Sequence, residues 1–172
     1  MRHKKAGKRL GRRSEERLAL ARNLTRGLFE QFGTKDREFI ITTLPKAKWV
    51  RSFAERCITL GVKGYKELQA AADANGCTVA ELKAQHTEQG KKVKDFPPKV
   101  QQHIARSLHL RRQALSKLRD PAMVRTLFEE IAPRYLDRPG GYLRVLRTGR
   151  VNLGDAAKKA LLGFVGEPTP AA

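Results

Sequence analysis

The chain begins with a basic segment that has almost nothing to bury. Of residues 1–13, seven are Lys or Arg and none is acidic, and Gly7 and Gly11 interrupt any helical pattern. Such a segment cannot bury enough apolar surface to offset the conformational entropy lost on folding. We therefore predict a flexible, extended basic arm over residues 1–13. Arms that combine glycine with arginine and lysine usually bind nucleic acid, and a solvated tail is the alternative.

The charge of the whole chain indicates a polyanionic partner. Its 172 residues carry 36 Lys and Arg against 17 Asp and Glu, for a formal net charge of +19. A small soluble domain needs a net charge of only about 2–8. The net charge is +11 over residues 1–63, +2 over residues 64–107 and +6 over residues 108–172. We therefore expect the two ends of the sequence to contact the polyanion.

No pattern typical of catalysis or metal binding occurs in the sequence. The two cysteines, Cys57 and Cys77, are too few for a disulfide framework or a zinc finger, and the four histidines lack metal-ligand spacing. A glycine-rich phosphate loop, a secretory signal and an apolar run of membrane-spanning length are absent as well. We therefore predict a cytoplasmic protein that is not an enzyme and contacts no membrane. We also expect it to need no metal, cofactor or small-molecule substrate.

Apolar residues at spacings of three and four predict four main helices. These helices cover residues 14–32, 45–61, 99–118 and 121–131. Ser14 and Asp120 are the predicted N-caps of the first and the last. Gly61 and Gly64 are expected to end the second helix, and Pro133 to stop the last.

Runs of β-branched and aromatic residues predict three strands, at residues 39–43, 142–146 and 160–165. With the helices, they predict a two-layer α+β fold, in which several helices cover one face of a small three-stranded sheet. Residues 64–107 contain an alanine-rich stretch, a lysine-rich run and two consecutive prolines. We interpret them as an inserted helical hairpin and linker within a single domain spanning residues 14–165. Residues 166–172 are predicted to be a disordered tail.

Several residues outside the arm are candidates for contact with a polyanion. Lys46 and Lys48 lie at the start of the second predicted helix, where cations are unfavourable and a bound anion would explain them. Arg17 and Arg22 lie mostly off the apolar stripe of the first helix, so they either face solvent or extend the basic surface. Trp49 either stacks on a base or packs in the core. Because aromatic residues make up only 6% of the chain, we predict recognition of backbone and shape, with little base stacking.

Three blocks of the sequence, in this order, resemble the bacterial large-subunit ribosomal protein seventeen family. The blocks are residues 1–23, beginning MRHKK; residues 42–60, with TTLPKAK and ITL; and residues 111–156, with RR, PRY, GGY and GDA. Each block alone has low specificity, whereas the three together are specific. Residues 64–107 have no counterpart in the usual short members of the family. Because this segment is nearly neutral, we expect it to face solvent or another protein.

The resemblance implies a two-layer α/β fold and a structural role in the large ribosomal subunit, in support of translation. It also implies binding to the large (23S-type) ribosomal RNA near the nascent-chain tunnel exit. The arm would thread between RNA helices, and neighbouring large-subunit ribosomal proteins would be further partners. The resemblance implies no cofactor and no reaction. A free-standing DNA-associated or regulatory protein that uses the same arm is the alternative.

The residues expected to contact RNA are mostly basic side chains from the arm, the starts of the first two helices and the C-terminal third. A glycine pair joins them, because glycine permits close approach of a phosphate, although a plain turn is its more usual role. The full set is Arg2, His3, Lys4, Lys5, Lys8, Arg9, Arg12, Arg13, Arg17, Arg22, Lys46, Lys48, Arg134, Arg138, Gly140, Gly141 and Arg144.

Overall fold

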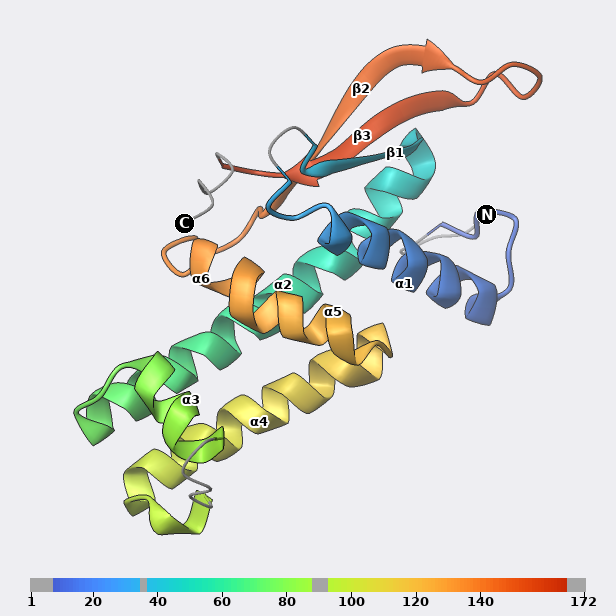
Figure 1. The fold of residues 1–172 in the computed structure, drawn as a ribbon. Helices are drawn as coiled ribbons and strands as arrows, with labels where there is room; N and C mark the ends of the chain where they lie inside the picture. Colours follow the sequence, from blue (N-terminus) through green and yellow to red (C-terminus); the bar gives the residue numbers. More distant parts are fainter. Residues whose placement is uncertain (1–7, 35–36, 88–92, 167–172) are drawn as a thin grey trace. The chain divides into compact units, whose positions relative to one another are not determined.

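The structure is a computed structural model that describes residues 8–34, 37–87 and 93–166 (Figure 1). The chain divides into two compact units. Unit 1 comprises residues 1–57 and 138–172, and unit 2 comprises residues 58–137. The single domain with an insertion at 64–107 stays a prediction. The predicted tail lies outside the described residues beyond Gly166.

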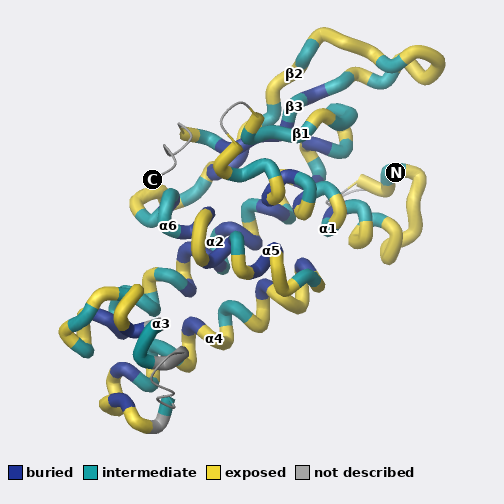
Figure 2. Tube along the Cα trace, in the orientation of Figure 1, coloured by how far each residue is buried: buried dark blue, intermediate teal, exposed yellow. Residues whose placement is uncertain are grey.

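Unit 1 is built on a three-stranded antiparallel sheet, which confirms the predicted α+β class. The strands are β1 (Phe39–Thr43), β2 (Leu143–Val151) and β3 (Lys158–Phe164), in the order β1-β3-β2. The β2–β3 hairpin is longer than predicted. Its pairing continues past Arg147 and Ala160, through an irregularity, to Val151 and Lys158. The far half of this hairpin is largely exposed (Figure 2).

One face of the sheet packs against the helices of unit 1. Ala160 and Leu162 of β3 are fully buried. Phe164 contacts two rings of α1 (Ser14–Glu30) and its C-terminal turn, with centroid distances of 6.3 Å to Phe29 and 5.0 Å to Phe32. Figure 1 shows α1 and the first turns of α2 (Leu44–Asn75) on the same side of the sheet. The other face of the sheet is therefore left open within unit 1.

Helix α2 is longer than predicted. It begins directly after β1 and continues through Gly61 and Gly64, where the sequence predicted its end. That prediction was wrong because both glycines face other side chains of unit 2. A Cβ on Gly61 would lie 3.0 Å from the Leu127 side chain, and a Cβ on Gly64 would overlap the Phe128 ring. Here glycine permits close packing and does not end the helix.

Unit 2 contains the second half of α2 and a series of further helical segments. They are α3 (Val79–Thr87), η1 (Val93–Asp95), α4 (Pro98–Leu118), α5 (Pro121–Thr126), η2 (Leu127–Ile131) and α6 (Ala132–Arg134). The predicted cap at Asp120 is confirmed, because its Oδ1 accepts a hydrogen bond from the Ala122 amide at 3.0 Å. The predicted stop at Pro133 was wrong. The chain stays helical through the π-helical turn η2, and Pro133 fits the first turn of α6, where its missing N–H is not needed.

Within the segment from 64 to 107, described residues form a small core of their own. Ala71, Leu82, Phe96 and Val100 are buried together. Helices α2 and α4 are also joined by polar contacts. The Ser107 hydroxyl donates to the Gly64 carbonyl at 2.9 Å, and His103 Nδ1 lies 2.7 Å from Glu67 Oε2. The described part of the predicted linker includes η1 and the buried Phe96.

Candidate nucleic-acid interface

The described part of the arm, residues 8–13, is attached to the first turn of α1. The Arg17 guanidinium donates through Nη1 to the Lys8 carbonyl at 3.1 Å. Within the arm, the Arg12 amide donates to the Arg9 carbonyl at 3.1 Å, which forms a tight turn. Arg17, predicted either to face solvent or to contact RNA, thus fixes the base of the arm. Arg2, His3, Lys4 and Lys5 lie outside the described residues.

An open hollow of about 790 Å³ lies between the arm and the start of α1. Its lining is mainly basic and consists of Arg9, Gly11, Arg12, Arg13, Ser14, Glu16 and Arg17. The predicted N-cap, Ser14, is wrong. Arg13 is the extended residue that precedes the helix, and its amide donates to Glu16 Oε2 at 3.1 Å. The carboxylate of Glu16, the acidic residue of this lining, therefore accepts a hydrogen bond at the helix end. Arg9, Arg12 and Arg13 are exposed around the hollow.

The remaining candidates on helices of unit 1 are Arg22, Lys46 and Lys48. Arg22 is half-buried on α1. Lys46 is half-buried and Lys48 exposed, and the first turn of α2 contains no acidic residue. The partial positive charge of this helix end is therefore uncompensated within the turn, as a site for an anion requires.

The C-terminal candidates divide between the two units. Arg138 Nε donates to the Gly140 carbonyl at 3.2 Å, and Gly141 has a φ of 65°, so the glycine pair forms a turn that leads into β2. Arg144 is exposed on β2. Arg134 belongs to unit 2, where its guanidinium lies 5.6 Å from the centre of the Tyr135 ring. Arg134 thus has a packing contact within its own unit.

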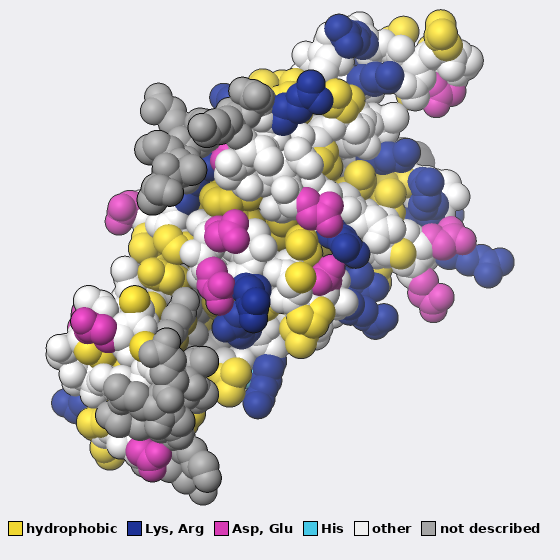
Figure 3. Space-filling model, viewed as in Figure 1, with side chains coloured by type: hydrophobic (Ala, Val, Ile, Leu, Met, Phe, Trp, Pro, Cys, Tyr) yellow, Lys and Arg dark blue, Asp and Glu magenta, His cyan; other side chains and the backbone are white. Residues whose placement is uncertain are grey.

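A second basic surface, which the sequence pattern did not predict, lies on the β2–β3 hairpin. Besides Arg144, it carries Arg147, Arg150, Lys158 and Lys159, and the three strands contain no acidic residue. Figure 3 shows Lys and Arg side chains along the hairpin and around the start of α1. The predicted strands were too short to include these residues. The sequence did carry a signal for this surface: these basic residues stand among alternating apolar residues, as they do in a strand with one exposed face.

The remaining expectations from the sequence concern Trp49, metal binding and membrane-spanning helices. Trp49 is half-buried, so both of its predicted roles stay open. Among the described residues, no group of His, Cys, Asp and Glu could hold a metal ion. In the same part of the chain, no helix is long and apolar enough to span a membrane.

Comparison with known proteins gives a consistent result. A family model described as "Ribosomal protein L17" matches residues 20–165. The chain is 37% identical to the large ribosomal subunit protein bL17 of Rhodopirellula baltica, over 97% of this chain and 82% of that protein. The bL17 protein of Trichlorobacter lovleyi is 34% identical, over 99% of this chain and 98% of its own length. That of Syntrophotalea carbinolica is 35% identical, over 97% and 76% respectively.

Proposed function

Because this chain belongs to the ribosomal protein L17 family, we propose that it binds the large (23S-type) ribosomal RNA and scaffolds it near the exit of the nascent-chain tunnel. Membership makes the chain a structural, non-enzymatic constituent of the large subunit of the cytoplasmic ribosome. The position near the tunnel exit is supported by the three sequence blocks that resemble the family. RNA binding is also supported by the chemistry of unit 1.

The observation that carries the proposal is the placement of exposed arginines around the start of α1. Arg9, Arg12 and Arg13 surround one open hollow, and its acidic side chain, Glu16, is already bonded to a backbone amide. A phosphate that enters this hollow meets the guanidinium groups of Arg9, Arg12, Arg13 and Arg17 against the single carboxylate of Glu16. Guanidinium groups match phosphate oxygens in a two-pronged geometry, which strengthens such contacts.

The proposed mechanism is neutralisation of phosphate charge, which lets RNA segments pack close together. The arm supplies a dense cluster of positive charge, and Arg17 of α1 holds this cluster at Lys8 through a hydrogen bond to the Lys8 carbonyl. Lys46 and Lys48 add charge at the start of α2, and the β2–β3 hairpin adds a further basic surface. Each phosphate neutralised releases counterions, so binding weakens with salt.

The segment 64–107 serves a different partner in this proposal. It carries seven basic and five acidic residues, whereas all the charged residues of the three strands are basic. We place it against solvent or a neighbouring ribosomal protein. Cross-linking of purified large subunits from Lys66 and Lys99 tests this. We expect no RNA adducts, and peptide adducts only if a neighbouring protein covers the segment.

The test of the main proposal is sedimentation of a cell lysate through a sucrose gradient in moderately high salt. The chain is quantified in each fraction, and RNA cross-linked to it by ultraviolet light is sequenced. We expect about one copy per large subunit and cross-links to large-subunit RNA close to the tunnel exit. A chain that stays at the top of the gradient, or that follows the DNA, would contradict the proposal.

A further inference from the structure

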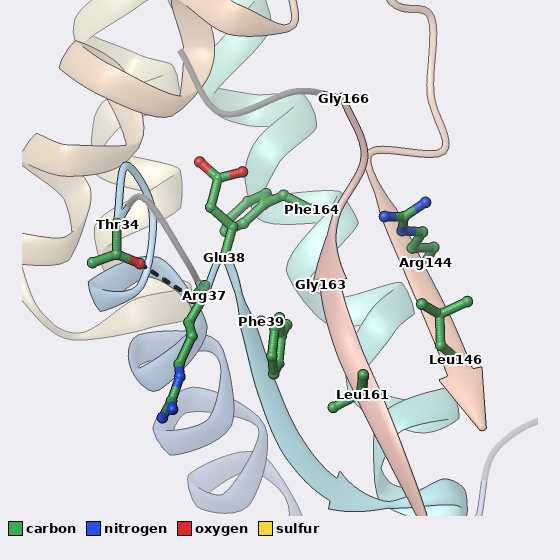
Figure 4. A pocket seen from close by; sticks show the side chains of 10 residues that line it. All are labelled: Thr34, Arg37, Glu38, Phe39, Arg144, Leu146, Leu161, Gly163, Phe164 and Gly166. Carbon is green, nitrogen blue, oxygen red and sulfur yellow. Dashed lines mark hydrogen bonds between the residues drawn. The ribbon is translucent and has the colours of Figure 1, made fainter. Parts of the chain in front are cut away.

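Three residues lie in one row across the open face of the sheet in unit 1. Phe39 of β1 and Arg144 of β2 both pair with Gly163 of the central strand β3. Residues that pair across a sheet project from the same face. Phe39 and Arg144 therefore stand on either side of a position that has no side chain (Figure 4).

Gly163 lies in the lining of a hollow of about 180 Å³ on this face, together with Phe39, Arg144, Leu146 and Leu161. A Cβ at position 163 would lie 2.9 Å from the Phe39 Cβ and 3.1 Å from the Glu38 carbonyl oxygen. A larger residue would displace Phe39 and fill the hollow. Glycine inside a strand often marks a place where a ligand or another backbone approaches closely.

The next row on the same face is apolar. Ile41, Leu161 and Leu146 lie side by side across the three strands. Ile41 is 63% exposed and Leu146 is 46% exposed, so the helices of unit 1 do not cover this row. The hollow is thus one end of an accessible surface that combines an aromatic ring, aliphatic groups and an arginine.

The charge around the hollow favours an anionic partner. The three strands carry three arginines, two lysines and no acid. Glu38 stands at the rim, where its Oε1 accepts a hydrogen bond from the Gly33 amide at 3.1 Å. Arg37 lies on the β1 side of the hollow and Arg144 on the β2 side (Figure 4).

We propose that this hollow receives an unpaired RNA base, stacked on Phe39 with the Arg144 guanidinium beside it. The proposal rests on the RNA binding proposed above, and it specifies the form of RNA: an extruded or single-stranded nucleotide. Every base has a π-face that can stack on an aromatic ring, and a guanidinium plane can stack as well. The surrounding basic residues attract the phosphates on either side of the base.

An apolar segment of a neighbouring protein is the competing occupant. It would fill the row of Ile41, Leu161 and Leu146. However, it would gain nothing from Arg144 or from the other basic residues of the strands. The combination of an aromatic ring, a cross-strand arginine and an acid-free sheet therefore favours RNA, and the protein occupant becomes an outcome of the test.

The binding test uses the full chain and two RNA hairpins. One hairpin carries a single unpaired 2-aminopurine, and the other lacks that nucleotide. We expect the chain to bind the bulged hairpin roughly tenfold more tightly, with a change in 2-aminopurine fluorescence on stacking. Phe39→Leu should abolish this preference, because leucine keeps the apolar bulk but has no π-face, and Phe39→Tyr should retain it. Arg144→Gln should reduce the preference, and Arg106→Gln on α4 should not.

The outcomes separate this proposal from RNA binding in general. Equal affinity of the wild-type chain for both hairpins would overturn the base site and leave RNA binding intact. If neither hairpin binds, the base site is overturned, and the sedimentation test decides RNA binding separately. Thermal melts identify any Phe39 variant that fails to fold. If Phe39→Leu does not fold, a loss of the preference for the bulged hairpin in a folded Phe39→Tyr variant would overturn the base site.

A second test examines the assembled subunit. A photoreactive benzoylphenylalanine is placed at position 41, next to the hollow, and purified large subunits are irradiated. Cross-links to a nucleotide that is unpaired in the RNA support the proposal. Cross-links to a neighbouring protein alone would show that the face is a protein interface, and would overturn it.

Discussion

Gly64 of α2 lies directly against the ring of Phe128 in η2, so closely that a Cβ on the glycine would overlap the ring. The Gly64 carbonyl also accepts a hydrogen bond from the buried Ser107 hydroxyl of α4 at 2.9 Å. Three helical segments of unit 2 therefore meet at one residue without a side chain. This close contact allows α2 to continue past a position where glycine ordinarily weakens a helix.

We predict that Gly64→Ala lowers the free energy of unfolding by up to about 2 kcal/mol. Alanine improves helix propensity by about 1 kcal/mol, but overpacking a well-filled core costs about 1–3 kcal/mol. Urea unfolding of the isolated chain, followed by circular dichroism, measures the change. Gly27→Ala in α1 is the matched control, because a Cβ there would meet nothing within 4 Å. It should stabilise the chain, and equal effects of both variants would contradict the packing argument.

Thr25 provides a second test of the core of unit 1. Its side chain is fully buried, and among the described residues its hydroxyl has no hydrogen-bond partner. Burying an unsatisfied hydroxyl costs about 1–3 kcal/mol, and valine has nearly the same shape and helix propensity. We expect Thr25→Val to raise the free energy of unfolding by about 1 kcal/mol. Thr25→Ser, which keeps the hydroxyl and loses the methyl group, should lower it. A destabilising Thr25→Val would mean that the hydroxyl has a partner after all.

The cap of α5 gives a third prediction. Asp120 Oδ1 accepts hydrogen bonds from the Ala122 amide at 3.0 Å and the Met123 amide at 3.4 Å. Removing such a cap costs about 1 kcal/mol. Asp120→Ala should therefore lower the melting temperature, which differential scanning calorimetry measures. Asp120→Asn keeps an oxygen acceptor and should retain most of the stability, so a similar loss in both variants would indicate that charge, not capping, is decisive.

Local patterns predicted much of the fold. The strand at 39–43 and the helix through Leu118 follow from periodicity, and Asp120-Pro121 is a short-range signal. The end of α2 could not be predicted in this way. Whether Gly64 ends a helix or packs inside one depends on Phe128, which lies 64 residues further along the chain.

The candidate interface was predictable where it consists of continuous charge. The arm is basic in sequence alone, so it could be proposed as an RNA-binding segment without knowledge of the fold. The hollow over Gly163 was different, because Phe39 and Arg144 become neighbours only through the pairing of β1 and β2 with β3. The low aromatic content argued against base stacking, yet one ring placed beside a glycine can provide a stacking site.

Salt dependence tests the arm directly. Replacing Arg9, Arg12 and Arg13 by glutamine removes three of the charges around the hollow at the start of α1. Because each neutralised phosphate contributes about 0.7–0.9 to the slope of log affinity against log salt, we expect the slope for large-subunit RNA to flatten by about 2–3. Filter binding over a range of salt concentrations measures it. The matched control replaces three exposed arginines of unit 2: Arg106, Arg112 and Arg125. It removes the same net charge and should leave the slope almost unchanged. If both triple variants flattened the slope equally, net charge alone would drive binding, and the arrangement of the arm would not matter.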